Sequence, residues 1–212
     1  MSTTYSSEME AKPASSTVKE QLYSILHSGY SHPVLRQWQA TNNAISASHL
    51  MYPVFITDDP DGNEEIISMK GQHRVGSNRV VELLEPLVKK GLSSILLFGV
   101  IAKHKKDGRG TGACMDNSPI VTTVKIIRKA FPPLVVACDV CLCPYTSHGH
   151  CAILRENGLV DNDASISRLA EISLAYAKAG KFLDLLVQLT QIPLALGYSP
   201  VIQELISSPR PT

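Results

Sequence analysis

Three cysteines in one short segment are the residues of this chain best suited to metal chemistry. Residues 138–151 read CDVCLCPYTSHGHC, and Cys141, Cys143 and Cys151 lie within this segment. Successive side chains of an extended segment alternate in direction, so Cys141 and Cys143 point the same way and can chelate one ion, with Cys151 as a third ligand. Because thiolates bind zinc well, the spacing predicts a zinc site.

The number of sulfur ligands favours a catalytic zinc over a structural one. Zinc with three protein ligands keeps its fourth position open for water or a substrate oxygen. Pro144 and Gly149 would let the chain turn back and bring the third sulfur close. His148 and His150 are alternative or outer ligands. A histidine in the fourth position would instead close the site as a structural knuckle, which is the alternative interpretation.

Two neighbours of the cysteines have different expected roles. Asp139 stands two residues before Cys141, on the same side of the predicted strand, so its carboxylate could orient groups or move protons beside the metal. Cys138 is expected to face away, as a small buried hydrophobe. A redox pair is disfavoured, since the pattern is Cys-x-Cys and not Cys-x-x-Cys. Cys114 is isolated and receives no role.

Alternating strands and helices must position this segment. Unbroken apolar runs predict three strands of a parallel sheet that is covered by helices, and apolar stripes between turn residues predict three helices. The expected strands are residues 51–56, 94–99 and 134–140, and the expected helices are residues 78–90, 118–130 and 165–179. In the first helix, Asn78 is the expected cap, Pro86 a kink and Gly91 the stop.

Three strand-helix units indicate a parallel α/β fold. On this pattern a (β/α)₈ barrel and an open doubly wound sheet are equally favoured. Both architectures place active sites beyond the carboxyl ends of their strands, and the cysteine segment follows the third predicted strand. The location therefore agrees with a functional metal.

Composition narrows the class of protein. The chain has 212 residues, of which 44% are hydrophobic and 18% charged, and a formal net charge of +1. Acidic and basic residues are well mixed, so neither a nucleic acid nor an anionic membrane is suggested as partner. No apolar stretch reaches the roughly 20 residues of a membrane span, and the N-terminus lacks the features of a secretory signal. An odd number of cysteines suits metal thiolates better than disulfides, so we expect the cytosol.

Four regions are expected along the chain. Residues 1–21 are polar and predicted to be disordered, residues 22–50 form an N-terminal arm with short helical pieces, and residues 51–180 hold the strand-helix units. Residues 181–212 are a tail, whose apolar stretch at 181–197 fits neither a clean strand nor a clean amphipathic helix.

The cysteine segment resembles, almost residue for residue, the zinc-binding segment of the porphobilinogen synthase family, also called delta-aminolevulinic acid dehydratase. The resemblance covers roughly residues 25–180. Further similar segments follow in the same order: HSGY at 27–30 with Arg36, YPVFI at 52–56, MKGQHR at 69–74, LFGV at 97–100, and residues 169–180. Lys70, where the family usually has proline, and Ala152, where it often has glycine, depart from it without touching the ligands.

The resemblance implies a fold and an activity. The family is a (β/α)₈ TIM barrel with an extended N-terminal arm that wraps a neighbouring subunit, usually in a homo-octamer. It condenses two molecules of 5-aminolevulinate into porphobilinogen, on the route to heme and other tetrapyrroles. Carried over by position, Cys141, Cys143 and Cys151 would bind Zn²⁺, Asp139 would be an active-site carboxylate, and His150 would contribute to a second, non-catalytic zinc.

The resemblance ends near Gly180, before the second half of the family's barrel. That half carries the two lysines that form imines with substrate and the arginines that bind its carboxylate. Lys178 matches a helix that is not catalytic in the family, and Lys181 belongs to the unmatched tail, so neither inherits the role. We therefore expect an incomplete barrel of about three strand-helix units that is inactive alone. The alternative is a non-catalytic zinc-binding or assembly variant that joins full-length subunits through its arm.

Overall fold

One mostly parallel sheet organises the molecule. The computed structural model describes residues 32–39, 45–101, 106–180 and 185–189. Neighbouring strands of the sheet are parallel, except for the antiparallel pair β2 and β3. In spatial order the strands are β2 (Asn63–Glu65), β3 (His73–Val75), β1 (Met51–Thr57), β4 (Ser94–Val100), β5 (Val135–Val140) and β8 (Leu185–Leu189).

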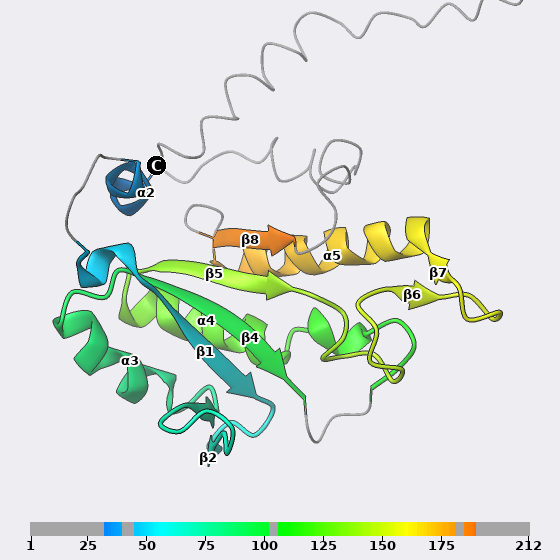
Figure 1. Ribbon diagram of the computed structural model, residues 1–212, viewed down its shortest axis with the longest axis horizontal. Helices are drawn as coiled ribbons and strands as arrows, with labels where there is room; N and C mark the ends of the chain where they lie inside the picture. The colour runs from blue at the N-terminus through cyan, green and yellow to red at the C-terminus, as the bar shows by residue number, and fades with distance from the viewer. Residues whose placement is uncertain (1–31, 40–44, 102–105, 181–184, 190–212) are drawn as a thin grey trace, which may run out of the picture.

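Three helices connect the parallel strands and share one face of the sheet. They are α3 (Val80–Lys89), α4 (Pro119–Ala130) and α5 (Asn162–Gly180). Helix α4 packs on β1 and β4, α5 packs on β5 and β8, and each helix contacts its neighbour in the chain (Figure 1). The strands β1, β4, β5 and β8 therefore follow one another in space in the same order as in the sequence.

The core lies between this helical layer and the sheet. Alternate strand residues point into it, among them Val54, Ile56 and Leu97, all of them buried. Ile127 of α4 and Val136 of β5 belong to the same cluster. The helices cover one face of the strands, and the burial of β1 and β4 accordingly alternates between buried and partly exposed residues, although their apolar runs are unbroken.

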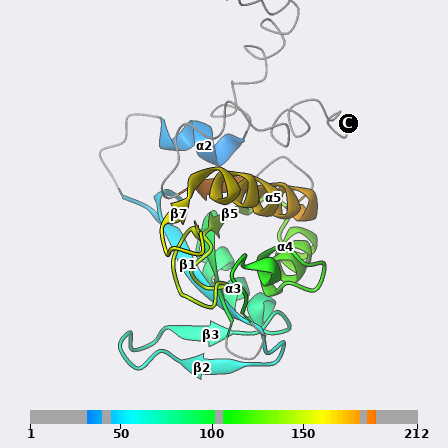
Figure 2. The same ribbon diagram turned by 90° about the vertical axis from the view of Figure 1, so that its right-hand side faces the viewer.

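Smaller elements surround the sheet. Near the N-terminal side, α2 (Pro33–Trp38) contacts a 3₁₀ turn (Ala47–His49), and the indole Nε1 of Trp38 donates to the carbonyl of Ser48 at 3.0 Å. After the cysteine segment, β6 (Ile153–Leu154) and β7 (Val160–Asp161) form a short antiparallel hairpin. Figure 2 shows the hairpin of β2 and β3 at the end of the molecule away from α5.

The predicted helices and strands are confirmed, with differences at their ends. Gly91 ends the first helix with a φ of +96°, as expected of a glycine stop. Asn78 as helix cap was wrong: α3 begins at Val80, and the Asn78 amide donates instead to the carboxylate of Asp61 at 2.9 Å. Helix α5 begins three residues before the predicted start at residue 165.

The tail holds one element that the sequence pattern did not predict. Residues within the stretch 181–197 form β8, which pairs in parallel with β5 over five positions. An apolar run without alternation is compatible with either a strand or a buried helix. Residues 185–189 are a strand because they pair with the edge of β5. The predicted disordered segment 1–21, most of the arm, and the rest of the tail lie outside the described residues.

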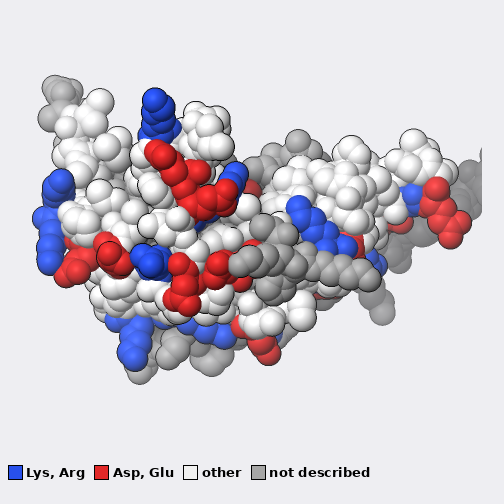
Figure 3. Space-filling view, turned by 90° about the horizontal axis from the view of Figure 1, so that it is seen from below, with Lys and Arg blue, Asp and Glu red and all other residues white. Residues whose placement is uncertain are grey.

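Surface properties add two observations. Among the described residues, no helix is both long enough and apolar enough to cross a membrane. On the face seen in Figure 3, acidic and basic side chains occur side by side over the surface.

Candidate metal centre

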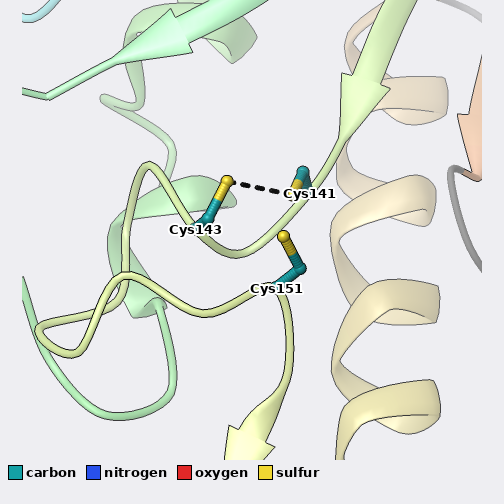
Figure 4. A group of neighbouring side chains, drawn as sticks. All are labelled: Cys141, Cys143 and Cys151. Atoms are coloured by element: carbon teal, nitrogen blue, oxygen red, sulfur yellow. Dashed lines mark hydrogen bonds between the residues drawn. The ribbon is translucent and has the colours of Figure 1, made fainter.

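The three predicted cysteine ligands converge at the carboxyl end of β5. The Sγ atoms of Cys141, Cys143 and Cys151 all lie within 4.8 Å of one another, and those of Cys141 and Cys143 are 3.3 Å apart. Cys141 directly follows β5, Cys143 lies in the next turn, and Cys151 precedes β6, with the three side chains directed toward a common point (Figure 4). Cys141 is buried, Cys143 is half-buried and Cys151 is exposed, so the cluster opens to solvent on one side.

Turns within residues 141–151, called the metal loop below, bring the sulfurs together. The backbone N–H groups of Tyr145 and Thr146 both donate to the carbonyl of Leu142 at 2.9 Å. Gly149 has a φ of +73°, which only glycine adopts without strain, and it reverses the chain toward Cys151. The predicted turning role of Gly149 is therefore confirmed, and the first turn contains Pro144 as expected.

A buried tyrosine anchors the metal loop in the core. Tyr145 is 3% exposed, and its hydroxyl lies 3.3 Å from the hydroxyl of Tyr176 on α5. The ring reaches under β4 at Gly99, where an added Cβ would collide with the tyrosine hydroxyl. Glycine is therefore required at that point of the strand, because the loop's aromatic side chain occupies the space of a side chain.

A second loop lies against the metal loop. Residues 107–114, called the adjacent loop below, form a parallel bridge between Asp107 and Thr146. The N–H of Ser147 donates to the carbonyl of Asp107 at 3.0 Å. Gly110 packs directly on Leu142 and Tyr145, with a φ of +62°. The position of the metal loop therefore depends on contacts with the loop that follows β4.

The electrostatics of the cluster favour a cation. Burial is the main reason that the pKa of the Cys141 thiol lies far above its ordinary value. Burial also raises the pKa of the Cys143 thiol, and the negative charges of Cys151 and Asp139 raise it further. Burial also raises the pKa of the Asp139 carboxyl. Three thiolates and a carboxylate cannot all be charged here without compensation, and a bound dication supplies it.

Cys138 and Asp139, which precede the cluster on β5, lie on opposite sides of the strand, as the alternation of strand side chains predicts. Cys138 is fully buried in the core beside the residues of the helical layer, which confirms its packing role. Asp139 is half-buried on the other side of the strand, and its negative charge contributes to raising the pKa of the Cys143 thiol. The strand therefore separates a packing cysteine from the chemically useful residues.

His148 and His150 make contacts that stabilise the metal loop, and neither belongs to the three-cysteine cluster found among the described residues. The Nδ1 atom of His148 accepts from the N–H of His150 at 3.2 Å, and Nε2 lies 3.4 Å from the carbonyl of Gly108. An Nε2–H tautomer satisfies both contacts. The ring of His150 stacks on that of His148 with centroids 5.5 Å apart. The second zinc site predicted at His150 stays a prediction.

The donor set fits zinc. Tetrahedral zinc with sulfur bonds of about 2.3 Å needs sulfur atoms about 3.8 Å apart. The observed spacing, from 3.3 Å to within 4.8 Å, brackets this value, so small side-chain rotations are enough to bind the ion. Three sulfurs leave the fourth position to a further ligand, as in catalytic sites.

Some residues that support the site have only faint sequence signals. Gly99 is the last residue of the predicted strand 94–99 and lies within β4, and an isolated glycine in a strand signals a close approach of another chain segment. Tyr176 and Arg168 lie on the predicted third helix, where nothing in their spacing distinguishes them from ordinary helix residues. Their contacts with the loops join positions far apart in the sequence, which a local pattern does not encode.

Comparison with known proteins identifies the family. The profile of the delta-aminolevulinic acid dehydratase family matches residues 24–184. The chain is 54% identical over 157 residues to the delta-aminolevulinic acid dehydratase of Bos taurus, covering 74% of this chain and 48% of that protein. It is 55% identical over 157 residues to that of Schizosaccharomyces pombe, covering 74% and 47%. The chain thus spans about half the length of these relatives.

A solved structure agrees with the sequence comparison. The delta-aminolevulinic acid dehydratase of Toxoplasma gondii ME49, determined in complex with the reaction product porphobilinogen, superposes with a TM-score of 0.62 at 26% identity. The match covers 69% of this chain and 41% of that one. Sequence and fold together show that this chain belongs to the delta-aminolevulinic acid dehydratase, or porphobilinogen synthase, family.

Proposed function

We propose that this chain carries the zinc-binding half of a porphobilinogen synthase active site. Cys141, Cys143 and Cys151 would hold the ion, and Asp139 would be the carboxylate beside it. The observation that carries the proposal is the convergence of three sulfurs, within 4.8 Å, at the carboxyl end of a parallel strand. Enzymes built on parallel α/β sheets place their chemistry at this end.

The sheet would form part of the wall of a TIM barrel. Two observations support this proposal: β1, β4, β5 and β8 follow the order of the chain, and consecutive helices contact each other on one face. A doubly wound sheet reverses its strand order and carries helices on both faces. The described strands do not close on themselves, in keeping with an incomplete barrel.

The residues around the ion would bind and orient 5-aminolevulinate. When bound, zinc supplies a Lewis acid that polarises a substrate oxygen. The half-buried Asp139 carboxyl, whose pKa is raised by burial, would hold a proton or accept a hydrogen bond from the substrate's amino group. The open, exposed side of the cluster at Cys151 gives the substrate its access.

The imine-forming lysines would come from elsewhere. In the family they belong to the second half of the barrel, and this chain spans about half the length of its relatives. The 212 residues alone would therefore bind substrate without completing the condensation. A homo-oligomer joined through the arm, a cytosolic location and a second zinc at His150 are proposed on family membership alone.

The division of the active site can be tested with radiolabelled 5-aminolevulinate. The zinc-loaded chain is equilibrated with the label, with and without borohydride, and compared with Cys143→Ser and with the control Cys138→Ala, whose thiol lies in the core. We expect reversible, zinc-dependent binding to wild type and control, and weak binding to Cys143→Ser, because one of three metal ligands is lost.

Two results would contradict the proposal in different ways. Label that binds equally well without zinc would show that a metal at the cysteines takes no part in binding 5-aminolevulinate. Covalent fixation by borohydride at one label per chain would place an imine-forming lysine within these residues, because borohydride reduces an imine to a stable amine.

A further inference from the structure

A buried arginine on α5 donates hydrogen bonds to the backbone of the adjacent loop. Arg168 is 5% exposed. Its Nε donates to the carbonyl of Arg109 at 3.1 Å, and its Nη2 donates to the carbonyls of Gly110 at 3.1 Å and Thr111 at 3.3 Å. Three consecutive carbonyls of one loop therefore accept from a single guanidinium, a fixed fork of donors that suits such a cluster.

Two side chains complete the surroundings of this guanidinium. Nη1 of Arg168 donates to the carboxylate of Glu171 at 2.6 Å, and Nη2 lies 3.1 Å from the Sγ of Cys114. Glu171 is on the same helix, one turn onward, and is half-exposed, so it balances the buried charge without contacting the loop. The three carbonyls and the Cys114 sulfur, and not the ion pair, connect the helix to the adjacent loop.

The carbonyls that accept from Arg168 belong to the adjacent loop, which packs on the metal loop. A Cβ added at Gly110 would lie 3.2 Å from Leu142 and 3.3 Å from Tyr145, so the two loops pack closely there. The carbonyl of Asp107, in the same loop, accepts from the N–H of Ser147 at 3.0 Å. A path of direct contacts thus leads from Arg168 through the adjacent loop to the segment between Cys143 and Cys151. Helix α5 spans 19 residues and packs on the sheet, so it is a firm support for two irregular loops.

We propose that Arg168 is a positioning residue of the metal centre, which holds the metal loop in its metal-binding form through the adjacent loop. The proposal rests on the zinc role assigned above and extends it to a residue that touches neither sulfur nor ion. Without the guanidinium, three carbonyls lose a charged donor in a buried place, and the adjacent loop loses its tie to α5. The metal loop then samples arrangements in which the sulfurs are apart.

The test compares Arg168→Met and Arg168→Lys with the control Arg155→Met, whose guanidinium is exposed and pairs with Asp161 in the hairpin of β6 and β7. Hydrogen exchange is followed in the metal-free full chain, and zinc affinity is measured by competition with a chelator. The informative amide is that of Ser147, which donates to Asp107.

In Arg168→Met we expect exchange at Ser147 to rise roughly tenfold or more, because a charge-assisted tie is lost, while amides of β1 and β4 keep their protection. Zinc affinity should fall roughly tenfold to a hundredfold, as it does when outer supports of metal ligands are removed. Arg168→Lys should lie between, since one ammonium cannot reach three carbonyls as a guanidinium does. The control should match wild type in both measurements.

Equal loss of protection at Ser147 and throughout the sheet would show a purely structural role, and unchanged exchange at Ser147 would also overturn the proposal. If Arg168→Met does not fold, the comparison of Arg168→Lys with wild type decides by the same criteria. A wild-type chain that binds no zinc would refute the assigned metal role, while exchange in the metal-free chain would still report whether Arg168 positions the loop.

Discussion

At the scale of single residues, Asp107 organises the turn beside the metal loop. Its carboxylate accepts from the N–H groups of Arg109 at 2.7 Å and of Thr111 at 3.2 Å, and from the Thr111 hydroxyl. Burial alone would raise the pKa of Asp107, but these hydrogen bonds from Thr111, Arg109 and Gly110 outweigh it and lower the pKa. The charged carboxylate therefore stabilises the folded loop.

The lowered pKa of Asp107 predicts how stability changes with pH. A group whose pKa is lower in the folded state stabilises the fold above its unfolded pKa, and this contribution is lost as the pH falls through the folded pKa. Asp107→Asn should therefore unfold about 1 kcal/mol more easily than wild type at neutral pH, the usual net contribution of a hydrogen bond. Urea denaturation at neutral pH and at about pH 3 should show the gap narrowing, because the carboxyl of the unfolded chain is then largely protonated.

The control for this experiment is Asp116→Asn, since Asp116 is exposed. Its denaturation midpoint should follow wild type at both pH values. A gap between Asp107→Asn and wild type that persists undiminished in acid would contradict the assigned role of the Asp107 charge.

The three cysteines of the candidate metal centre were predictable as a cluster because their spacing is local. Cys141 and Cys143 follow the alternation of a strand, and Cys151 follows a turn that Gly149 makes possible, so eleven consecutive positions contain the cluster. Arg168 was not predictable, because its role depends on carbonyls about 58 positions away in the sequence. Backbone acceptors carry no signature of residue type.

At the scale of elements, the metal loop is tied to α5 by a pair of tyrosine hydroxyls. Tyr145 and Tyr176 are both buried, and their oxygens are 3.3 Å apart. Burial is the first cause that raises the pKa of both phenols, so they are neutral and one donates to the other. The pair joins the metal loop to the C-terminal part of α5.

This pairing predicts a non-additive double substitution. Tyr176→Phe should destabilise the chain by about 1 to 3 kcal/mol, since it leaves the Tyr145 hydroxyl buried without that partner, and Tyr145→Phe should act similarly. The double variant should be less destabilised than the sum of the two, because both polar groups are then removed together. Chemical denaturation of the four proteins measures the cycle. Strict additivity would show that the hydroxyls do not interact.

Helices and strands were predictable where their own sequence pattern determines their type and bounds. The strands at β1, β4 and β5 and the helices α3 to α5 were found from apolar runs and stripes. The start of α3 was misplaced, because the Asn78 side chain prefers the distant carboxylate of Asp61 to the helix end. Strand β8 was missed because its pairing with β5, and not its own pattern, defines it.

At the scale of the whole molecule, the order of the strands in space is the informative feature. Strands β1, β4, β5 and β8 run in chain order with helices α3, α4 and α5 on one face, and the family relatives are about twice as long as the region they share with this chain. The sequence pattern alone left barrel and doubly wound sheet open, because both repeat the same strand-helix unit. Strand order in space separates them, and only pairing in three dimensions reveals that order.

The zinc coordination of the whole chain tests the account most directly. X-ray absorption spectroscopy of the protein loaded with one equivalent of zinc per chain should show zinc with three sulfur neighbours at about 2.3 Å and one lighter ligand. The Cys143→Ser variant should show two sulfurs, and Cys138→Ala should keep three, since Cys138 lies in the core. A first coordination shell made only of nitrogen and oxygen, or one unchanged in Cys143→Ser, would contradict the assignment of Cys141, Cys143 and Cys151 as the metal centre.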